Sequence, residues 1–304
     1  MIQAFEKARA FIYRNARPLD LARFQYHLED GDKAAVMQAL SFYQNEDGGF
    51  GHGVEADCWN PHSITLHAGT ACRIILDIDF DDADHPVIQG LLRWCESGAL
   101  FNGHTWALDV PSNNDYPHAP WWHADSKSAC RTDYNETARI AGFIIRYAER
   151  DSGAFRLGLR IIQEAIAAIP PDGISDMHTC SCYVIMAEQL ARDQAIDLFP
   201  YDALREKLHR SVDRLIEKDP AKWNAYVCRP SFFLSSRDSE FYPEHQAAAE
   251  AECDFILQNQ QEDGSWPITW AWGAYPEEWA VSKNWWKSHL IIQNLLYLKG
   301  FGRL

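Results

Sequence analysis

Residues 44–51 read QNEDGGFG, and residues 260–266 read QQEDGSW. Each segment carries a glutamine, an Asp-Gly pair and an aromatic residue at the same spacing, and each follows an apolar run with helical periodicity. An Asp-Gly pair supplies the positive-φ turn that commonly follows a helix. We therefore expect both segments to follow a helix and to form the same turn.

Helical periodicity recurs along the chain, whereas the alternation typical of a strand is confined to fragments such as CYVIM at residues 182–186. The loops alternate between short ones and long ones rich in Gly, Pro, Asn and aromatic residues, which predicts diverged helical pairs in an all-α fold. The clearest helical patterns cover residues 63–76, 85–95, 136–150, 154–169, 178–193, 201–218, 244–260 and 285–300.

Segments 40–50 and 256–266 resemble the Gln-Trp repeat of α/α toroids, the fold of squalene–hopene cyclases and protein prenyltransferase β subunits. In that motif the glutamine hydrogen-bonds the start of a neighbouring helix, and the aromatic ring packs against a helix end. The resemblance implies a closed ring of inner and outer helices, formed by a single domain over residues 1–304.

Segments 14–31, 44–61 and 114–122 also resemble bacterial prenyltransferase-like proteins, which carry squalene-oxidase repeats and have no defined activity. The implied function is a terpenoid-cyclase-like or prenyl-handling enzyme that binds an apolar isoprenoid in a central aromatic cavity. In such a ring, residues that precede inner helices face the cavity mouth, and four groups of candidate residues follow from this.

The first group directly precedes the helix expected at residues 63–76. Asp57 and His62 are candidate proton-transfer residues. The alternative is structural, with Asn60 or Ser63 acting as the helix cap. The candidates of this group are Glu55, Asp57, Asn60 and His62.

The second group is a polar and aromatic loop around residues 115–123. Adjacent tryptophans suit a wall that stabilises a carbocation or stacks on a sugar ring. Alternatively, the loop simply fills the ring. The candidate substrate-binding residues are Asp115, Tyr116, His118, Trp121, Trp122 and His123.

The third group lies in DYNETA, residues 133–138, which resembles the Asp-x-Asp-Asp-Thr-Ala motif of class II terpene cyclases. In that motif a protonated aspartic acid donates a proton to an alkene or epoxide. Asn135 stands here in place of the central acid, so Asp133 and Glu136 remain as catalytic candidates. The structural alternative is that Asp133 or Asn135 caps the following helix.

The fourth group lies in SDMHTCSCY, residues 175–183, where Asp176, His178, Cys180 and Cys182 are metal ligands by residue type. His178 and Cys182 share one face of a predicted helix, but two such side chains do not make a zinc site. We therefore expect no resident cofactor; zinc is the alternative, and magnesium is left open. His178, Trp270 and Trp272 complete the candidate substrate-binding residues.

Composition and charge limit which binding partners and which cellular compartment we expect. The net charge of −15 disfavours nucleic acid and anionic membrane surfaces. No apolar run is long enough to span a bilayer, and the start of the chain lacks the apolar centre of a secretion signal. Eight scattered cysteines without a CxxC pair favour a reducing cytoplasm. The sequence leaves the oligomeric state open.

Two other functions remain open. Ring-shaped helical folds also host glycosidases and lyases, which need paired carboxylates beside stacking aromatics. Glu55, Asp57, Asp115 and Asp133 near the two adjacent tryptophans would suit that chemistry. A ring that only binds a ligand, without catalysis, is the third possibility.

Overall fold

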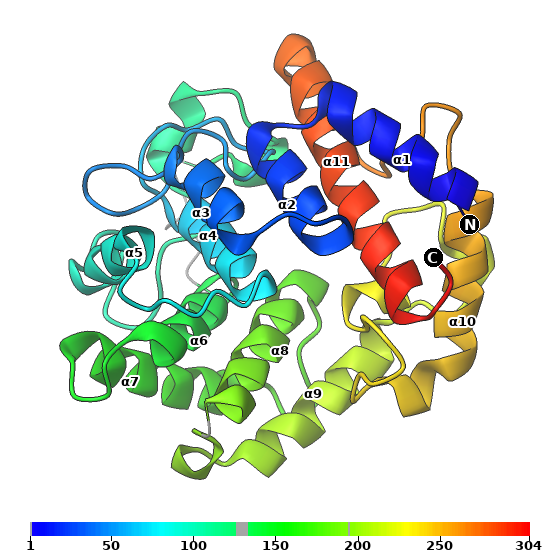
Figure 1. Ribbon diagram of the computed structural model, residues 1–304. Coiled ribbons are helices and arrows are strands. Elements are labelled where there is room, and N and C mark those ends of the chain that lie inside the picture. The colour runs from blue at the N-terminus through cyan, green and yellow to red at the C-terminus, as the bar shows by residue number, and fades with distance from the viewer. Residues whose placement is uncertain (1, 126–132, 194) are drawn as a thin grey trace. The chain divides into compact units, whose positions relative to one another are not determined.

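The computed structural model describes residues 2–125, 133–193 and 195–304. Within these ranges every regular element is a helix, and the β pairing is limited to isolated bridges such as the one between Cys58 and His118 (Figure 1). The prediction of an all-α chain is confirmed. None of the helices in these ranges is both long enough and apolar enough to cross a membrane.

The chain forms two compact units, which are described separately. Unit 1 combines the two ends of the chain, Met1–Ala39 and Val212–Leu304, and unit 2 is the middle segment Leu40–Ser211. Helices α3 (Lys33–Ser41) and α9 (Tyr201–Leu215) cross the boundaries between these segments. The prediction of one domain over residues 1–304 stays a prediction.

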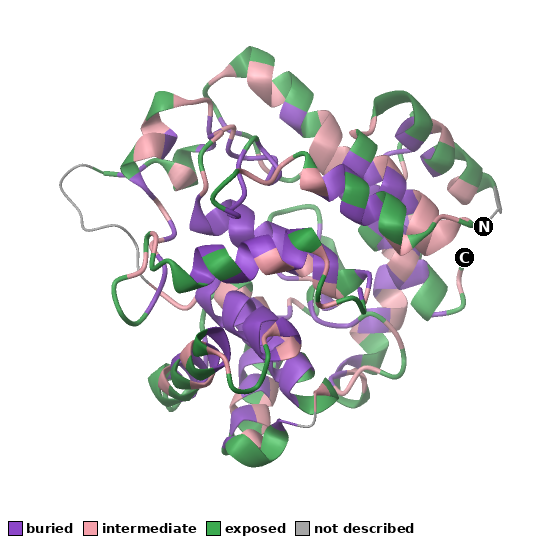
Figure 2. Ribbon diagram, turned by 60° about the vertical axis from the view of Figure 1, so that its left-hand side comes forward, coloured by how far each residue is buried: buried purple, intermediate pink, exposed green. Residues whose placement is uncertain are grey.

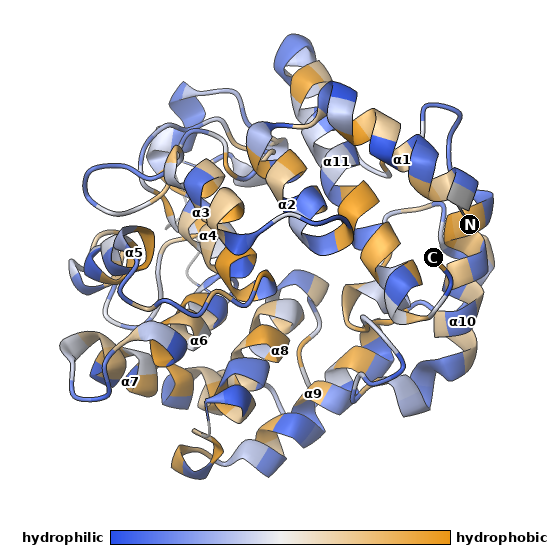
Figure 3. Ribbon diagram, in the orientation of Figure 1, coloured by the Kyte–Doolittle hydropathy of each residue, from blue (hydrophilic) through white to orange (hydrophobic). Residues whose placement is uncertain are grey.

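In unit 2, helices α4, α6 and α8 lie side by side, while α7 packs against α6 and α5 (Figure 1). Consecutive residues of α4 and α6 are buried on every side of the helix (Figure 2). Helices α5 and α7 instead bury one apolar face (Figure 3). The unit therefore has an enclosed layer and an amphipathic layer. The five helices are α4 (Thr65–Asp77), α5 (Pro86–Glu96), α6 (Thr137–Tyr147), α7 (Gly153–Ala168) and α8 (Met177–Arg192).

In unit 1 the long helix α11 packs against α1 and α2 from the start of the chain, and also against α10. Residues near the two ends of the sequence thus share one core. The helices of this unit are α1 (Ile2–Asn15), α2 (Pro18–Leu28), α10 (Tyr242–Gln258) and α11 (Pro276–Gly300).

The two repeated glutamines make the same hydrogen bonds in their respective units. Gln44 Nε2 donates to the carbonyl of Val87 in the first turn of α5, at 2.9 Å. Gln260 Nε2 donates to the carbonyl of Ala4 in the first turn of α1, at 2.8 Å. Each amide also donates to the carbonyl of the glycine four residues later. The expected bond from glutamine to the start of another helix is confirmed in both copies.

The glycine of each copy has a positive φ, 88° at Gly48 and 93° at Gly264. Each also touches the backbone of the helix that its glutamine contacts. A Cβ built on Gly48 would lie 2.1 Å from the carbonyl oxygen of Gly90, and one built on Gly264 would lie 2.1 Å from that of Lys7. Only glycine fits either position, because it tolerates both the φ and the close approach.

The aromatic residue of each copy is buried, Phe50 completely and Trp266 to 97%, since 3% of its surface is exposed. The indole N–H of Trp266 donates to the carbonyl of Ile256 in α10 at 2.7 Å. The second copy therefore bonds its aromatic ring to the last turns of the preceding helix.

The cysteines of the described residues are all buried and free of disulfide bonds. Cys130 lies outside the described residues.

Candidate functional site

Two loops of unit 2 are tied together by buried asparagines. Asn60 Nδ2 donates to Asn113 Oδ1 at 2.9 Å, and Asn113 Nδ2 donates to the carbonyl of Trp122 at 3.0 Å. Both asparagine side chains are fully buried. The N-cap position of α4 is Ile64, which has no side-chain cap, so the alternative that Asn60 or Ser63 caps this helix is wrong. Asn60 instead fixes the loop that carries the first group of candidates.

Glu55 and Asp57 are neighbours within that loop. Glu55 Oε2 accepts a hydrogen bond from the backbone N–H of Asp57 at 2.7 Å, and 8% and 4% of the two residues are exposed. The backbone N–H of Glu55 donates to His67 Nδ1 on α4 at 3.4 Å. His67 Nε2 therefore carries the proton and donates to the carbonyl of Asn60 at 3.2 Å. The loop thus places two acidic residues close together in a protein-enclosed position.

Three histidines and a tyrosine form a second cluster at the same loops. The Tyr116 hydroxyl lies 3.1 Å from Nε2 of the exposed His62. His118 Nδ1 donates to the carbonyl of Tyr116 at 2.6 Å, and His118 Nε2 lies 3.1 Å from His123 Nδ1. With neutral rings, His123 donates this second bond, which leaves its own Nε2 as an acceptor at the exposed end of the pair. The arrangement can transfer or accept protons at the surface.

The remaining candidates of the aromatic loop differ in exposure. Trp121 is 41% exposed, Trp122 is half-buried, and Asp115 is exposed. Trp122 packs against the small apolar cluster that includes Cys58 and Leu108. Trp121 is therefore the indole that is free to stack on a ligand.

Glu136 has an unusual backbone conformation directly before α6. Its φ and ψ are 58° and −41°, and the Thr137 N–H donates to the carbonyl of Asn135 at 2.7 Å. This is a γ-turn of the rare positive-φ form, which is strained for a residue with a side chain. Asp133 Oδ1 accepts from the Asn135 N–H at 2.9 Å and braces the turn. The N-cap position is Glu136, without a side-chain cap, so the alternative that Asp133 or Asn135 caps α6 is wrong.

Three helices position the Glu136 side chain and backbone. Its Oε2 pairs with Arg139 Nη1, one turn further along α6. On α4, a Cβ built on Gly69 would lie 1.8 Å from Oε2, so the carboxylate occupies the space that a side chain would fill. From α8, Cys182 Sγ accepts the Glu136 N–H at 3.3 Å.

His178 and Cys182 lie near this carboxylate but are poorly suited to hold a metal. Burial is the main reason that the pKa of the Cys182 thiol is raised to about 12; Arg139 lowers this pKa and Glu136 raises it, and the sulfur stays protonated at neutral pH. His178 is exposed to solvent, yet the surrounding protein lowers its pKa by desolvation. Among the described residues no three His, Cys, Asp or Glu side chains are grouped to hold a metal ion.

The candidates of unit 2 fall into two sets on different sides of α4. His67, which contacts the Glu55 loop, and Gly69, which contacts Glu136, are two residues apart and so project about 200° from one another around the helix. Asp57 and its neighbours form one set, and Asp133, Glu136 and His178 form the other. The structure does not bring the four catalytic candidates to one face of α4.

Trp270 and Trp272 belong to unit 1, in the loop between α10 and α11. The Trp270 ring meets Trp286 edge-on, with centroids 5.2 Å apart, and Trp272 is buried against Trp279 at 5.5 Å. Both indoles therefore take part in aromatic packing within their own unit.

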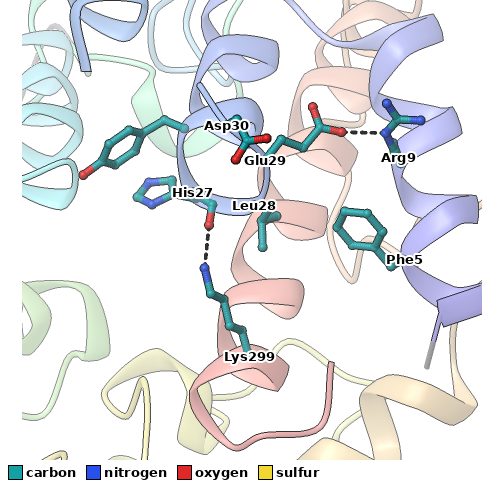
Figure 4. Close-up of a pocket in the computed structure, with 8 residues that line it drawn as sticks. Phe5, Arg9, His27, Leu28, Glu29, Asp30 and Lys299 are labelled. Carbon is teal, nitrogen blue, oxygen red and sulfur yellow. Dashed lines mark hydrogen bonds and ion pairs between the residues drawn. The ribbon is translucent and has the colours of Figure 1, made fainter. Parts of the chain in front are cut away.

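Unit 1 also contains an open cleft of about 640 Å³, which none of the candidates lines (Figure 4). Arg9 Nε pairs with Glu29 Oε1 at 2.5 Å, and Lys299 Nζ donates to the carbonyl of His27 at 2.9 Å (Figure 4). Most of the charged side chains that line the cleft therefore interact with one another or with the backbone at the end of α2.

Sequence reasoning missed two residues that hold Glu136, although both left a signal. Arg139 follows Glu136 by three residues, the spacing of an ion pair on one helix face. Gly69 lies inside a helical pattern, where a glycine often marks a close approach of another group. The missed asparagine Asn113 and histidine His67 left no comparable signal, because their partners come from loops far away in the sequence.

Comparison of the chain with protein-family models, with curated proteins and with solved structures found no match in any of the three.

Proposed function

We propose that this chain is an α/α toroid of the terpenoid-cyclase and prenyltransferase type, and that it binds an apolar isoprenoid. The observation that carries the proposal is the shared geometry of the two Gln-x-x-Asp-Gly segments. Gln44 and Gly48 join the end of α3 to α5, and Gln260 and Gly264 join the end of α10 to α1. In a closed ring of helical pairs, the last repeated turn is expected to contact the first helix, and Gln260 and Gly264 do contact α1.

The layers of unit 2 support the same proposal. A toroid needs inner helices that are buried on all sides and outer helices with one apolar face. Helices α4 and α6 fit the inner type, and α5 and α7 fit the outer type. Trp121 and the histidine cluster would lie at the cavity mouth of such a ring.

In the proposed enzyme, Asp57, His62, Asp133 and Glu136 remain the candidates for proton transfer. Glu136 is held by its ion pair with Arg139, and Asp133 braces the turn that carries Glu136. If isoprenoid turnover is detected, an unchanged rate in both Asp133→Asn and Glu136→Gln would remove these two residues from the mechanism.

A carbohydrate-active enzyme is the second candidate, favoured by the neighbouring Glu55 and Asp57. The bond from the Asp57 backbone N–H to Glu55 Oε2 keeps the two carboxyl groups below the upper limit of roughly 10 Å for paired glycosidase carboxylates. The exposed Trp121 could stack on a sugar ring.

A thermal-unfolding screen separates these functions. The purified chain is heated with squalene, a prenyl alcohol, a prenyl diphosphate and a set of oligosaccharides. A ligand present at 100 times its Kd stabilises the folded chain by about 2.7 kcal/mol. We expect stabilisation by isoprenoids, and product analysis by mass spectrometry then separates an enzyme from a binding protein. Stabilisation by oligosaccharides alone would overturn the proposal in favour of the second candidate.

A further inference from the structure

The Glu136 carboxylate has one engaged oxygen and one open oxygen. Oε2 pairs with Arg139 and rests against Gly69. Oε1 has no hydrogen-bond partner within the described residues, and 10% of the side chain as a whole is exposed. A strained turn and contacts from three helices therefore fix the carboxylate of Glu136 and leave Oε1 as the oxygen that can accept a hydrogen bond from a ligand.

The charge around Glu136 selects the group that this oxygen can bind. Because Arg139 already balances the carboxylate, an ammonium group would add an uncompensated positive charge at a largely buried position. A diphosphate would bring its negative charge against the carboxylate oxygen itself, although Arg73, one turn beyond Gly69 on α4, adds a positive charge near Cys182 and His178. The oxygen therefore suits a neutral hydrogen-bond donor.

A second polar group lies on the same face of α4. The Thr65 hydroxyl is buried and makes no hydrogen bond to any described residue. Thr65 precedes Gly69 by one helical turn, about 6 Å along the axis. A buried hydroxyl without a partner is costly, and a ligand hydroxyl could both donate to Glu136 and accept from Thr65.

We propose that Glu136 binds the hydroxyl group of an otherwise apolar isoprenoid alcohol. This inference rests on the proposed function and adds the chemical class of the head group. Gly69 and Arg139 act as positioning residues, because one leaves room for the carboxylate and the other fixes its engaged oxygen.

The test compares ligands that share one hydrocarbon chain. Kd values of farnesol, farnesyl methyl ether and farnesyl diphosphate are measured by titration calorimetry on the full chain. A carboxylate oxygen can bind a hydroxyl but not an ether, which has no proton to donate. We expect farnesol to bind about tenfold more tightly than the ether, as one hydrogen bond to a charged group contributes. The diphosphate is expected to bind most weakly.

Two variants change the acceptor in different ways. In Glu136→Gln the amide oxygen faces Arg139 and the amide N–H faces the ligand, so alcohol and ether are expected to bind about equally. Gly69→Ala keeps the charge but displaces the tip of Glu136, and the same loss of discrimination is expected. The matched control is Gly153→Ala, whose Cβ would lie 2.8 Å from the carboxylate of the exposed Glu96 and should leave the ratio unchanged.

The outcomes separate the two proposals. Equal affinities for farnesol and its ether in the unmodified chain, tighter binding of the diphosphate, or full discrimination in a folded Gly69→Ala variant would overturn the head-group assignment while the isoprenoid function stands. If none of the three compounds binds, the proposed function fails and this inference fails with it. Circular dichroism of each variant establishes that it is folded.

Discussion

His27 lies in the last turn of α2, beside the cleft of unit 1 (Figure 4). Burial, together with the positive charges of Arg23 and Lys299, lowers its pKa from 6.5 to about 4. The unfolded chain therefore binds more protons than the folded chain between these two values, and stability is lost as the pH falls through this window. We expect the free energy of unfolding to fall by on the order of 1 kcal/mol between pH 7 and pH 5 on account of His27.

Urea unfolding of the His27→Asn variant at both pH values checks this expectation. The variant should lose about that much of the pH dependence, because asparagine does not titrate. His52→Asn, which replaces an exposed histidine, is the control. An identical pH dependence in the chain with and without His27 would contradict the prediction.

Also at the residue scale, the sequence predicts which residue types gather near a site better than it predicts what each one does. The resemblance of residues 133–138 to an acid motif drew attention to Asp133 and Glu136. Their roles depend on distant partners, since Gly69 and Cys182 come from other helices. The γ-turn at Glu136 is not readable from sequence either, because positive φ at a glutamate is uncommon.

At the scale of elements, the two repeated turns depend on glycine for two separate reasons. We expect Gly48→Ala and Gly264→Ala each to destabilise the chain by about 3 kcal/mol or more, because a positive φ and a backbone contact both oppose the methyl group. Gly98→Ala is the control: its φ is 74° but nothing lies within 4 Å of the added Cβ, so about 1 kcal/mol is expected.

Chemical denaturation of the three variants measures these differences. A similar loss of stability at all three positions would mean that the positive φ alone accounts for the loss, and that the contacts with Gly90 and Lys7 contribute little. Losses at only one of the two repeated turns would contradict their equivalence.

Helical periodicity located eight helices to within a few residues, except that α11 begins at Pro276 instead of residue 285. The first part of α11 carries Trp279, Trp285 and Trp286, and this aromatic composition obscured the helix. Pro276 at the first position and two glutamates after it are ordinary helix-start signals. Loop contacts such as Asn60 with Asn113 could not be predicted, because no local pattern specifies the register of two long loops.

At the scale of the whole molecule, unit 1 is made from both ends of the chain. Helices α1 and α2 supply the surface on which α11 packs, and α1 supplies the carbonyl that Gln260 bonds. We expect a chain without residues 1–39 to lose the ordered structure of residues 212–304, while residues 40–211 resist limited proteolysis. Adding back a peptide of residues 1–39 should restore resistance. Persistent resistance of residues 212–304 in the shortened chain would contradict this expectation.

Hydrogen–deuterium exchange with and without farnesol tests the central claim most directly, namely that an isoprenoid binds in unit 2 beside Glu136. The account predicts slower exchange at residues 65–72, 133–142 and 178–183. These segments include Gly69, Arg139 and Cys182, which contact Glu136. Slower exchange confined to unit 1, or no change in exchange at saturating farnesol, would contradict it.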